Sequence, residues 1–381
     1  MTGTFRAGTR IVCGLGSLGG LPDEIDRLRA RRIAVVADLG LSGTPVLDRI
    51  LAEIEEQVCS MQLVEVDSPA APIERAADAA VAAGADAVLG IGGGSALGAA
   101  KAVALLLRNE RPLAALEGIG VAGRPPAPVV AIPTTAGSGS EVSNALVVHE
   151  PGRVREIVIR GDGYEPRVAI LDAVVLRGLP RAPMLFAALD ALSHAAEALW
   201  VRGGTLFSDA CALTAAREIF DVLPDAVDGA DDGRNSAGAN DLALQRLLEA
   251  ACLANLACGN SGLGLVHALS SSPLVELPHG LQNGVLLPYV ARFNAALVSP
   301  DAARLLERVP ALYSRLAFDP RFDADELDAE AMIAASSDHV FRTNNLRHSS
   351  DEQLRALLLE ATAGGPAPAT PERHERAREA R

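Results

Sequence analysis

Short runs of apolar, mainly β-branched residues alternate with alanine-rich stretches over the first half of the chain. These runs are continuous rather than alternating with polar residues, which is typical of strands covered on both faces of a parallel sheet. We expect strands at 33–37, 62–66, 87–91 and 129–132, with helices at 73–83 and 96–108. Strands and helices in alternation predict βαβ units and an α/β domain built on a mostly parallel sheet.

The pattern changes near position 178. Val and Ile runs become rare, and long segments have the composition and length of helices, at 184–199, 206–223, 240–256 and 285–297. The length of 381 residues suits two domains. We therefore expect an α/β domain over 1–178 and an all-α domain over 179–381. The tail at 363–381 is rich in Pro, Ala and charge, and is expected to be a solvated helix or frayed.

A glycine-rich turn follows the third expected strand and directly precedes a helix. Its residues are Gly92, Gly93, Gly94 and Ser95. Glycines let a ligand approach the backbone closely, and a helix N-terminus offers free N–H groups and a partial positive charge. The turn therefore favours a pyrophosphate site, with a merely flexible strand–helix turn as the alternative.

Two further segments could line the same ligand. Asp38 ends the first expected strand, where an acid can accept hydrogen bonds from ribose hydroxyls and repel a 2′-phosphate, or can simply cap a turn. Thr134, Thr135 and Ser138 lie in a hydroxyl- and glycine-rich run after another strand, which favours a polar ligand over a solvent loop. The letters GLGSLG at 14–19 also match GxGxxG, but no expected strand precedes them, so we expect an ordinary loop.

Four residues of the second half have the chemistry of metal ligands. Asp190 and His194 are four positions apart on an expected helix and so share one face. His267 and His279 follow, and Pro278 argues for a break between the elements that carry them. One carboxylate and three imidazoles would suit Fe²⁺ or Zn²⁺, although each histidine alone is more often a core or capping residue.

Composition excludes some classes of function. The chain has 34 basic and 48 acidic residues and a net charge of −14, so it lacks the positive field that nonspecific nucleic-acid or anionic-membrane binding needs. Neither an apolar signal core nor a stretch of about 20 apolar residues is visible. The five cysteines form no CxxC pair. We expect a cytoplasmic protein with buried free thiols and without nucleic-acid or membrane partners.

Together, these segments resemble the iron-containing (type III) alcohol dehydrogenase family, with some features of its maleylacetate reductase branch. The matching segments occur in family order: GGGS at 92–95, AK at 100–101, PTTAGSGSEV at 133–142, AILD at 169–172, DALSHAAE at 190–197, GLGLVHA at 262–268 and PHG at 278–280. PTTAGSGSEV and DALSHAAEA are specific, and they occur together.

The resemblance implies a dinucleotide-binding α/β domain, a helical domain and an active site in the cleft between them. It implies that Asp190, His194, His267 and His279 hold Fe²⁺ or Zn²⁺, which polarises the oxygen of a small alcohol or aldehyde while the nicotinamide exchanges hydride. It further implies that the GGGS turn holds the pyrophosphate and that Thr134 and Thr135 lie near the cofactor. Asp38 would favour NAD over NADP, and a homo-oligomer is expected.

The chain departs from the family pattern at several positions. Gly98 stands where the family commonly has Asp, as in the maleylacetate reductase branch, and Ser271 stands where a second histidine is frequent. The segments 268–278 and 294–344 are shorter than usual. Three alternatives stay open. The first is an oxo-acid reductase of the maleylacetate reductase type, which could work without a metal. The others are a lyase of the dehydroquinate synthase type and a relative that only binds nucleotide. The single lysine, Lys101, falls in the helix after the GGGS turn, which suggests a need for a compact ammonium.

Overall fold

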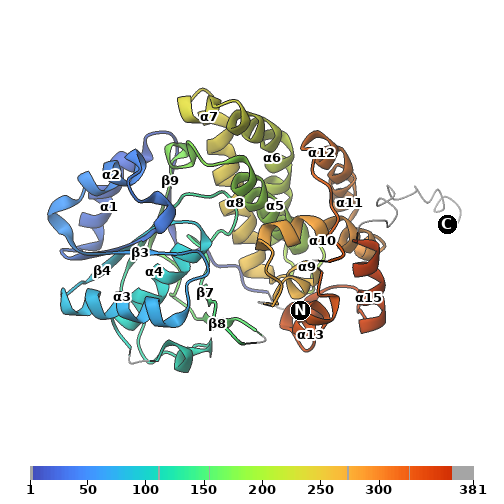
Figure 1. Cartoon of the computed structure of the whole chain (residues 1–381), viewed down its shortest axis with the longest axis horizontal. Coiled ribbons are helices and arrows are strands. Elements are labelled where there is room, and N and C mark those ends of the chain that lie inside the picture. Colours follow the sequence, from blue (N-terminus) through green and yellow to red (C-terminus); the bar gives the residue numbers. More distant parts are fainter. Residues whose placement is uncertain (1–2, 110–111, 154, 273, 326, 363–381) are drawn as a thin grey trace, which may run out of the picture.

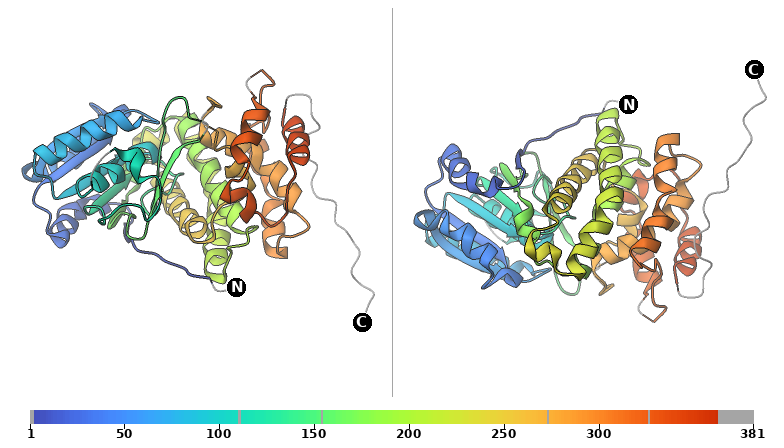
Figure 2. Two further views of the ribbon diagram at one scale, coloured as in Figure 1. Left: turned by 90° about the horizontal axis from the view of Figure 1, so that it is seen from below. Right: turned by 90° about the horizontal axis from the view of Figure 1, so that it is seen from above.

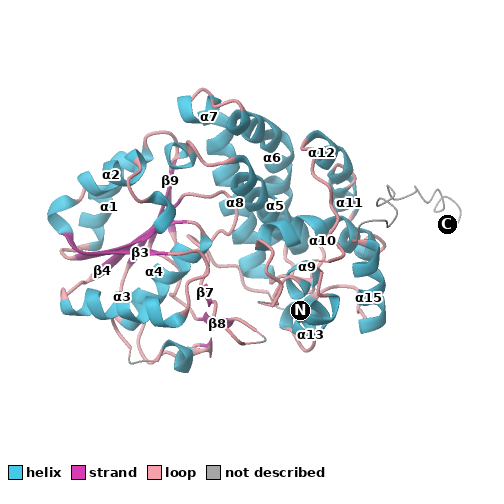
Figure 3. Ribbon diagram, in the orientation of Figure 1, coloured by secondary structure: helices cyan, strands magenta, loops and turns pink. Residues whose placement is uncertain are grey.

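The strands are confined to one half of the molecule, where helices pack against them, and the other half is helical. The computed structural model describes residues 3–109, 112–153, 155–272, 274–325 and 327–362, so the expectation for the tail at 363–381 lies outside the described residues. Figure 1 follows the chain from the sheet into the helical half, and Figure 3 shows the strands confined to the first. The prediction of an α/β domain followed by an all-α domain is confirmed.

The main sheet has six strands, and every neighbouring pair runs parallel. Across the sheet they lie in the order β1 (Arg10–Cys13), β9 (Val168–Leu171), β6 (Val129–Pro133), β4 (Ala87–Gly92), β2 (Ile33–Asp38) and β3 (Val58–Val64). The expected strand at 62–66 was wrong in its bounds, because β3 is an edge strand with partly exposed, mixed residues that give no clear start. The four-residue strands β1 and β9 were not expected.

A second, three-stranded sheet was also not expected. It orders β5 (Gly118–Ile119), β8 (Ile157–Arg160) and β7 (Ala145–Val148), and β7 and β8 form an antiparallel pair. The strands are short, and Val147 and Val158 face solvent, so their apolar letters do not mark a buried run. The main sheet is thus the parallel one that the sequence predicts, and the second sheet is a small mixed one, in which β5 and β8 run parallel.

Helices cover both faces of the main sheet, so neighbouring residues of one strand enter different cores. Val35 of β2 packs with α1 (Leu21–Leu28) and α2 (Pro45–Ala52), whereas Val36 packs with α3 (Ala70–Ala82) and α4 (Gly94–Leu106). This double burial explains the continuous apolar runs. Short 3₁₀ turns complete this half: η1 (Ser17–Gly20), η2 (Leu39–Leu41), η3 (Glu55–Gln57), η4 (Leu113–Leu116) and η5 (Ala173–Leu176).

The helical half is centred on α5 (Arg181–Ala198), which packs against α6 (Leu206–Asp231), α8 (Asp241–Ser261) and α10 (His279–Asn294). These four helices match the four expected ones, but α10 begins at His279, where the sequence suggested position 285, because Pro278 starts it. The remaining helices are shorter: α7 (Arg234–Ala237), α9 (Leu265–Leu269), α11 (Pro300–Leu306), α12 (Val309–Arg315), α13 (Ala329–Ser336), α14 (Val340–Asn344) and α15 (Asp351–Glu360). Within the described ranges, no helix has the length and apolar character needed to cross a membrane.

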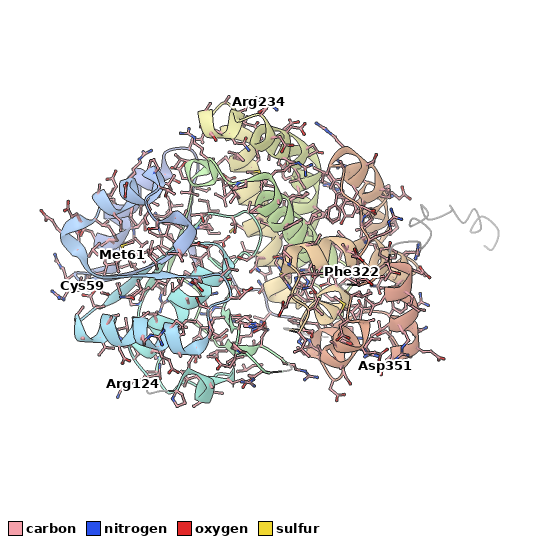
Figure 4. The ribbon with its side chains drawn as sticks, viewed as in Figure 1. Cys59, Met61, Arg124, Arg234, Phe322 and Asp351 are labelled. Atoms are coloured by element: carbon pink, nitrogen blue, oxygen red, sulfur yellow. The ribbon has the colours of Figure 1, made fainter. Side chains whose placement is uncertain are left out.

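The positions of the cysteines correct the expectation that all of the thiols are buried. All five cysteines are free, but only Cys252 and Cys258 are buried, so the expectation of buried thiols was wrong for the other three. Figure 4 places Cys59 with Met61 on the edge strand β3, opposite the helical half that contains Phe322. Figure 2 shows the N-terminal segment running from the sheet to α6, where the Phe5 and Phe207 rings lie 5.8 Å apart.

Lys101 ties helix α4 to the segment after β6. Its ammonium is buried and donates hydrogen bonds to the backbone carbonyls of Ser140, Ser143 and Ala145, with Nζ–O distances of 3.0, 3.2 and 2.6 Å. Burial lowers the pKa of Lys101 to about 7, and the nearby Glu141 carboxylate opposes this shift. Three N–H bonds on one compact centre match three acceptors, whereas a planar guanidinium would not fit this enclosed space.

Substitution of this lysine should destabilise the protein. We expect Lys101→Met to lower the free energy of unfolding by about 2 kcal/mol, since three buried carbonyls lose their donor. Lys101→Arg should cost a similar ~1–3 kcal/mol through overpacking. Urea unfolding measures both, and Arg217→Met, at an exposed cation of α6, should stay within about 0.5 kcal/mol of wild type. Lys101 variants as stable as this control would contradict the tethering role.

Candidate cofactor and metal site

Three of the expected cofactor segments meet at one edge of the main sheet. Strands β2, β4 and β6 are neighbours, and their registers place Asp38, Gly92 and Pro133 at adjoining carboxyl ends. The N–H of Thr134 donates to the carbonyl of Gly92 at 3.0 Å, which holds two of the segments together. Between β2 and β4 the strand order also reverses direction, and open α/β sheets bind ligands at such switch points.

The glycine-rich turn has the geometry of a phosphate cradle. Gly92 has φ +147°, and a Cβ there would lie 2.6 Å from Cβ of Ala96 and 2.9 Å from Cβ of Asp38. Helix α4 begins at Gly94 with no side-chain cap, so its first N–H groups are free to meet an anion. Both the conformation and the crowding at Gly92 exclude a side chain.

The hydroxyl-rich segment lies directly over this turn. A Cβ built on Gly93 would be 3.3 Å from Oγ1 of Thr135, and one built on Gly94 would be 2.8 Å from Cβ of Ser138. The hydroxyl of Ser95 donates to Oδ1 of Asp67 at 3.0 Å. The structure therefore brings the turn and the hydroxyl-rich segment together, as a shared ligand would require.

The two remaining candidates for the nucleotide site are Asp38 and the GxGxxG match at 14–19, and they lie in different parts of the sheet. Asp38 accepts a hydrogen bond from the Gly40 N–H at 2.7 Å through Oδ1, so it does cap a turn, and Oδ2 has no partner among the described residues. The GxGxxG match at 14–19 does follow a strand, β1, contrary to expectation. That strand lies at the sheet's far edge, and the segment forms the 3₁₀ turn η1, where the Leu18 N–H donates to Asp172.

The candidate metal ligands converge around Asp190. Asp190 and His194 project from the same face of α5, and Oδ1 of Asp190 lies 3.6 Å from Nε2 of His194. The same oxygen lies 3.3 Å from Nε2 of His267, on α9, and 3.8 Å from Nε2 of His279, the first residue of α10. Asp190, His194 and His267 are buried and form a group that could hold a metal ion, whereas the His279 side chain is half exposed.

Helix α10 places His279 through one close backbone approach. A Cβ on Gly280 would lie 2.1 Å from the carbonyl oxygen of Phe186 on α5, so only glycine allows this contact. One turn later on α10, the amide nitrogen of Asn283 lies 2.7 Å from Oδ1 of Asp190, 3.1 Å from Nε2 of His267 and 3.0 Å from Nε2 of His279. The Asn283 amide is therefore a centre on which three ligand atoms converge.

This donor set fits a cation. Nδ1 of His267 contacts Glu197 at 2.7 Å and His279 has a hydrogen bond to the Ser270 backbone, which leaves the Nε2 lone pairs directed at Asp190. The Asn283 amide has two N–H bonds for Oδ1 of Asp190 and the two Nε2 atoms, so satisfying all three takes a further positive centre, which is either a proton on His267 or a metal ion. Nδ1 of His194 is also buried without a partner among the described residues. Imidazole nitrogens and a carboxylate at this spacing suit Fe²⁺ or Zn²⁺.

The pKa shifts of Asp190, His194 and His267 reflect their burial and their electrostatic interaction with one another. Burial lowers the pKa of His194 to about 4. Burial also opposes protonation of His267, but its hydrogen bonds to Asp190 and Glu197 raise its pKa to about 9. Burial alone would raise the pKa of Asp190, yet the three histidines hold it well below its usual range. A metal ion that binds here therefore displaces protons and replaces their charge.

Two residues of this centre were not among the candidates from sequence. Asn283 belongs to α10 like His279, but neither a pattern nor a motif singled it out. Glu197 was quoted only as part of a motif, although its position seven residues after Asp190 puts both on one face of α5. Ser271, at the position where the family frequently has a second histidine, donates to the carbonyl of Ala268 at 2.8 Å.

The fold and this geometry combine an α/β half, whose glycine-rich turn could hold a phosphate, with a helical half whose carboxylate and histidines could hold a metal ion. Family models match nearly the whole described chain: "Iron-containing alcohol dehydrogenase" over residues 8–173 and "Fe-containing alcohol dehydrogenase family, C-terminal" over residues 185–361. The chain belongs to the iron-containing alcohol dehydrogenase family, and it is thus an oxidoreductase of the alcohol dehydrogenase class.

Three relatives are 30% to 35% identical to this chain over the aligned residues. A probable alcohol dehydrogenase of Salmonella typhimurium is 35% identical over 298 residues, which cover 76% of this chain and 73% of the relative. An NAD-dependent methanol dehydrogenase of Bacillus methanolicus is 30% identical over 78% of this chain and 77% of its own. A lactaldehyde reductase of Escherichia coli is 30% identical and covers 77% of each chain.

Solved structures agree with the fold. An iron-containing alcohol dehydrogenase from Thermococcus thioreducens is 28% identical, covers 95% of this chain and all of its own, and gives a TM-score of 0.83. A maleylacetate reductase from Rhizobium is 27% identical, covers 96% of this chain and all of its own, and gives a TM-score of 0.80. Both branches of the resemblance are therefore represented among the structural neighbours.

The crowding at Gly92 yields a test of the phosphate cradle. We expect Gly92→Ala to weaken NAD binding by at least roughly tenfold, about 1.4 kcal/mol, because a Cβ would push apart Ala96 and Asp38. Fluorescence titration measures the affinity. Gly19→Ala is the matched control, since a Cβ there has open space and the segment lies away from the crevice. Equal affinities of the two variants would argue against a cradle at the GGGS turn.

Proposed function

We propose that the protein transfers hydride between NAD(H) and a small alcohol or aldehyde with Fe²⁺ or Zn²⁺ held by Asp190, His194, His267 and His279. The observation that supports this most strongly is the convergence of three histidine nitrogens, each within 3.8 Å, on one carboxylate oxygen of Asp190. This buried group could hold a metal ion, and the family membership supports a catalytic divalent metal there.

The sheet half supplies cofactor binding in this proposal. The free N–H groups of α4 at Gly93, Gly94 and Ser95 hold the pyrophosphate, with Gly92 allowing its approach. Hydroxyl groups of Thr134, Thr135 and Ser138 contact the cofactor from the facing segment. The free oxygen of Asp38 accepts a ribose hydroxyl, and its charge disfavours the 2′-phosphate of NADP.

In this proposal, the helical half supplies the residues that hold the metal and face the substrate. A bound divalent metal acts as a Lewis acid that polarises the substrate oxygen. The chain's own residues hold that position: α5 carries Asp190 and His194, while the side chain of His279 is half exposed to solvent. Ser271 cannot relay a proton as a histidine would, so solvent at His279 is the expected proton acceptor.

An oxo-acid reductase of the maleylacetate reductase type is the second candidate. Gly98, where a Cβ would only touch the carbonyl of Val147, and the maleylacetate reductase neighbour support it. The presence of Asp190 among the histidines supports the metal-dependent reaction instead. A lyase of the dehydroquinate synthase type and a relative that only binds nucleotide have no particular observation in their favour.

The proposal also covers the division of the chain into domains, the location of the protein and its oligomeric state. We place the division of the chain at 178, between the end of η5 and the start of α5, with 1–178 binding NAD and 179–381 binding the metal and substrate. Five free cysteines support a cytoplasmic location. A homo-oligomer is expected from the family alone.

Metal analysis tests the proposal directly. Protein purified without oxygen should contain about one Fe²⁺ or Zn²⁺ per chain, and Asp190→Ala and His194→Ala should lose it, because removal of a ligand leaves three donors at most. Chelation should abolish NADH formation from short alcohols and diols, and added metal should restore it. His348→Ala, at an exposed histidine, is the control and should keep the metal. Metal-free wild type that still reduces an oxo-acid would favour the second candidate.

Coenzyme preference tests the role of Asp38. Asp38→Gly should raise the ratio of kcat/KM for NADP to that for NAD by roughly tenfold or more, about 1.4 kcal/mol, since the charge that repels the 2′-phosphate is removed. Asp38→Asn should raise the ratio too, although its amide oxygen can still cap the turn at Gly40. An unchanged ratio in both variants would reject the ribose role and leave the cap as the only one.

A further inference from the structure

The ring of His267 lies between two carboxylates, one at each ring nitrogen. Its Nε2 faces the candidate metal site, 3.3 Å from Oδ1 of Asp190. Its Nδ1 faces away and lies 2.7 Å from Oε2 of Glu197, whose side chain is completely buried. Glu197 touches none of the reacting groups directly, so it acts only through His267.

Glu197 is held in place by more than this contact. Its Oε1 accepts a hydrogen bond from the Val266 N–H at 2.6 Å, and Oε2 accepts one from the His267 N–H at 3.3 Å. Helix α9 has Gly264 at its N-cap and no side-chain cap of its own, so Glu197 caps this helix from α5. Two backbone N–H groups and the ring nitrogen of His267 surround this carboxylate, so both of its oxygens are placed to accept hydrogen bonds.

We propose that Glu197 is a positioning residue that makes His267 a metal ligand. An ionised carboxylate that only accepts hydrogen bonds requires the proton of a neutral His267 to be on Nδ1, and the lone pair of Nε2 then points to Asp190. The role of Glu197 rests on the metal site proposed above. Pairing of a ligating histidine with a carboxylate is a general means of fixing the ring and raising its basicity.

The spacing of residues along α5 explains how one helix can carry two candidate metal ligands and also Glu197. Asp190, His194 and Glu197 follow each other at intervals of four and three residues, so they form one stripe. The first two supply ligand atoms, and the third reaches past them to the start of α9. Gly264 leaves room for it, because a Cβ there would lie 3.0 Å from Oε1 of Glu197.

A glutamine at this position would preserve shape but not hydrogen bonding. Its amide has one acceptor oxygen where Glu197 uses two, so an NH₂ group must face Val266 or His267. If the oxygen keeps the bond from Val266, the NH₂ group donates to Nδ1 of His267 and the ring proton moves to Nε2. That proton then lies where the metal must bind.

The experiment compares metal affinity in wild type and Glu197→Gln. Competition with a chelator for Zn²⁺ should show binding weakened by about 10–100-fold in the variant. In the zinc-loaded wild type, proton NMR should show a strongly downfield, exchange-protected Nδ1–H of His267, assigned by its absence in His267→Gln. This resonance should be absent or shifted upfield in Glu197→Gln. Thermal unfolding and NAD affinity of the metal-free variant report whether it is folded.

Glu24→Gln is the matched control. Glu24 is another buried carboxylate, 4% exposed, but it pairs with Arg10 and Arg27 in the sheet half. It should lose stability and keep wild-type zinc affinity. Equal zinc affinity in Glu197→Gln and wild type, or a wild type without the downfield proton, would overturn the positioning role even if the variant folds poorly. Wild type that binds neither zinc nor iron would overturn the metal site itself.

Discussion

The close packing of separate backbone segments against helix α5 is the constraint on which the site depends. A Cβ on Gly137 would lie 2.6 Å from the carbonyl oxygen of Ala187, and one on Gly280 would lie 2.1 Å from that of Phe186. Glu197, near the other end of α5, caps α9. Since no side chain fits at either glycine, the cofactor segment and α10 are fixed against the helix that carries the first two candidate ligands.

A centre built in this way is costly to fold without a cation. The acceptors around Asn283 outnumber its N–H bonds, and Oδ1 of Asn283 has no partner among the described residues. Buried polar groups are normally satisfied, so a concentration of unsatisfied ones marks a place where function has taken precedence over stability. The overall charge of −14 is compatible with an anionic ligand at the start of α4, because the helix N-terminus offers a local partial positive charge.

Sequence reasoning succeeded where the signal is local. The strands β2, β4 and β6 and the turn at Gly92 follow from apolar runs and glycines, and the pairing of Asp190 with His194 follows from helical spacing. Residue type made His267 and His279 candidates, and the family resemblance supported their grouping with Asp190, from which they are 77 or more positions away along the chain. Four-residue strands such as β1 and β7 are too short for periodicity. The contacts of Glu197 depend on where α9 lies, which only the folded chain determines.

One segment connects the two halves of the site. The residues after β6 contact the GGGS turn through Thr135 and Ser138, and the same segment meets α5 through Gly137. The side-chain amide of Asn255, on α8, donates to the carbonyl of Ser138 at 2.9 Å. Lys101 then holds the end of this segment against α4. Because a single short segment contacts both the GGGS turn and the helix that carries Asp190 and His194, it couples the positions of the two, and reactions between bound groups depend on such positioning.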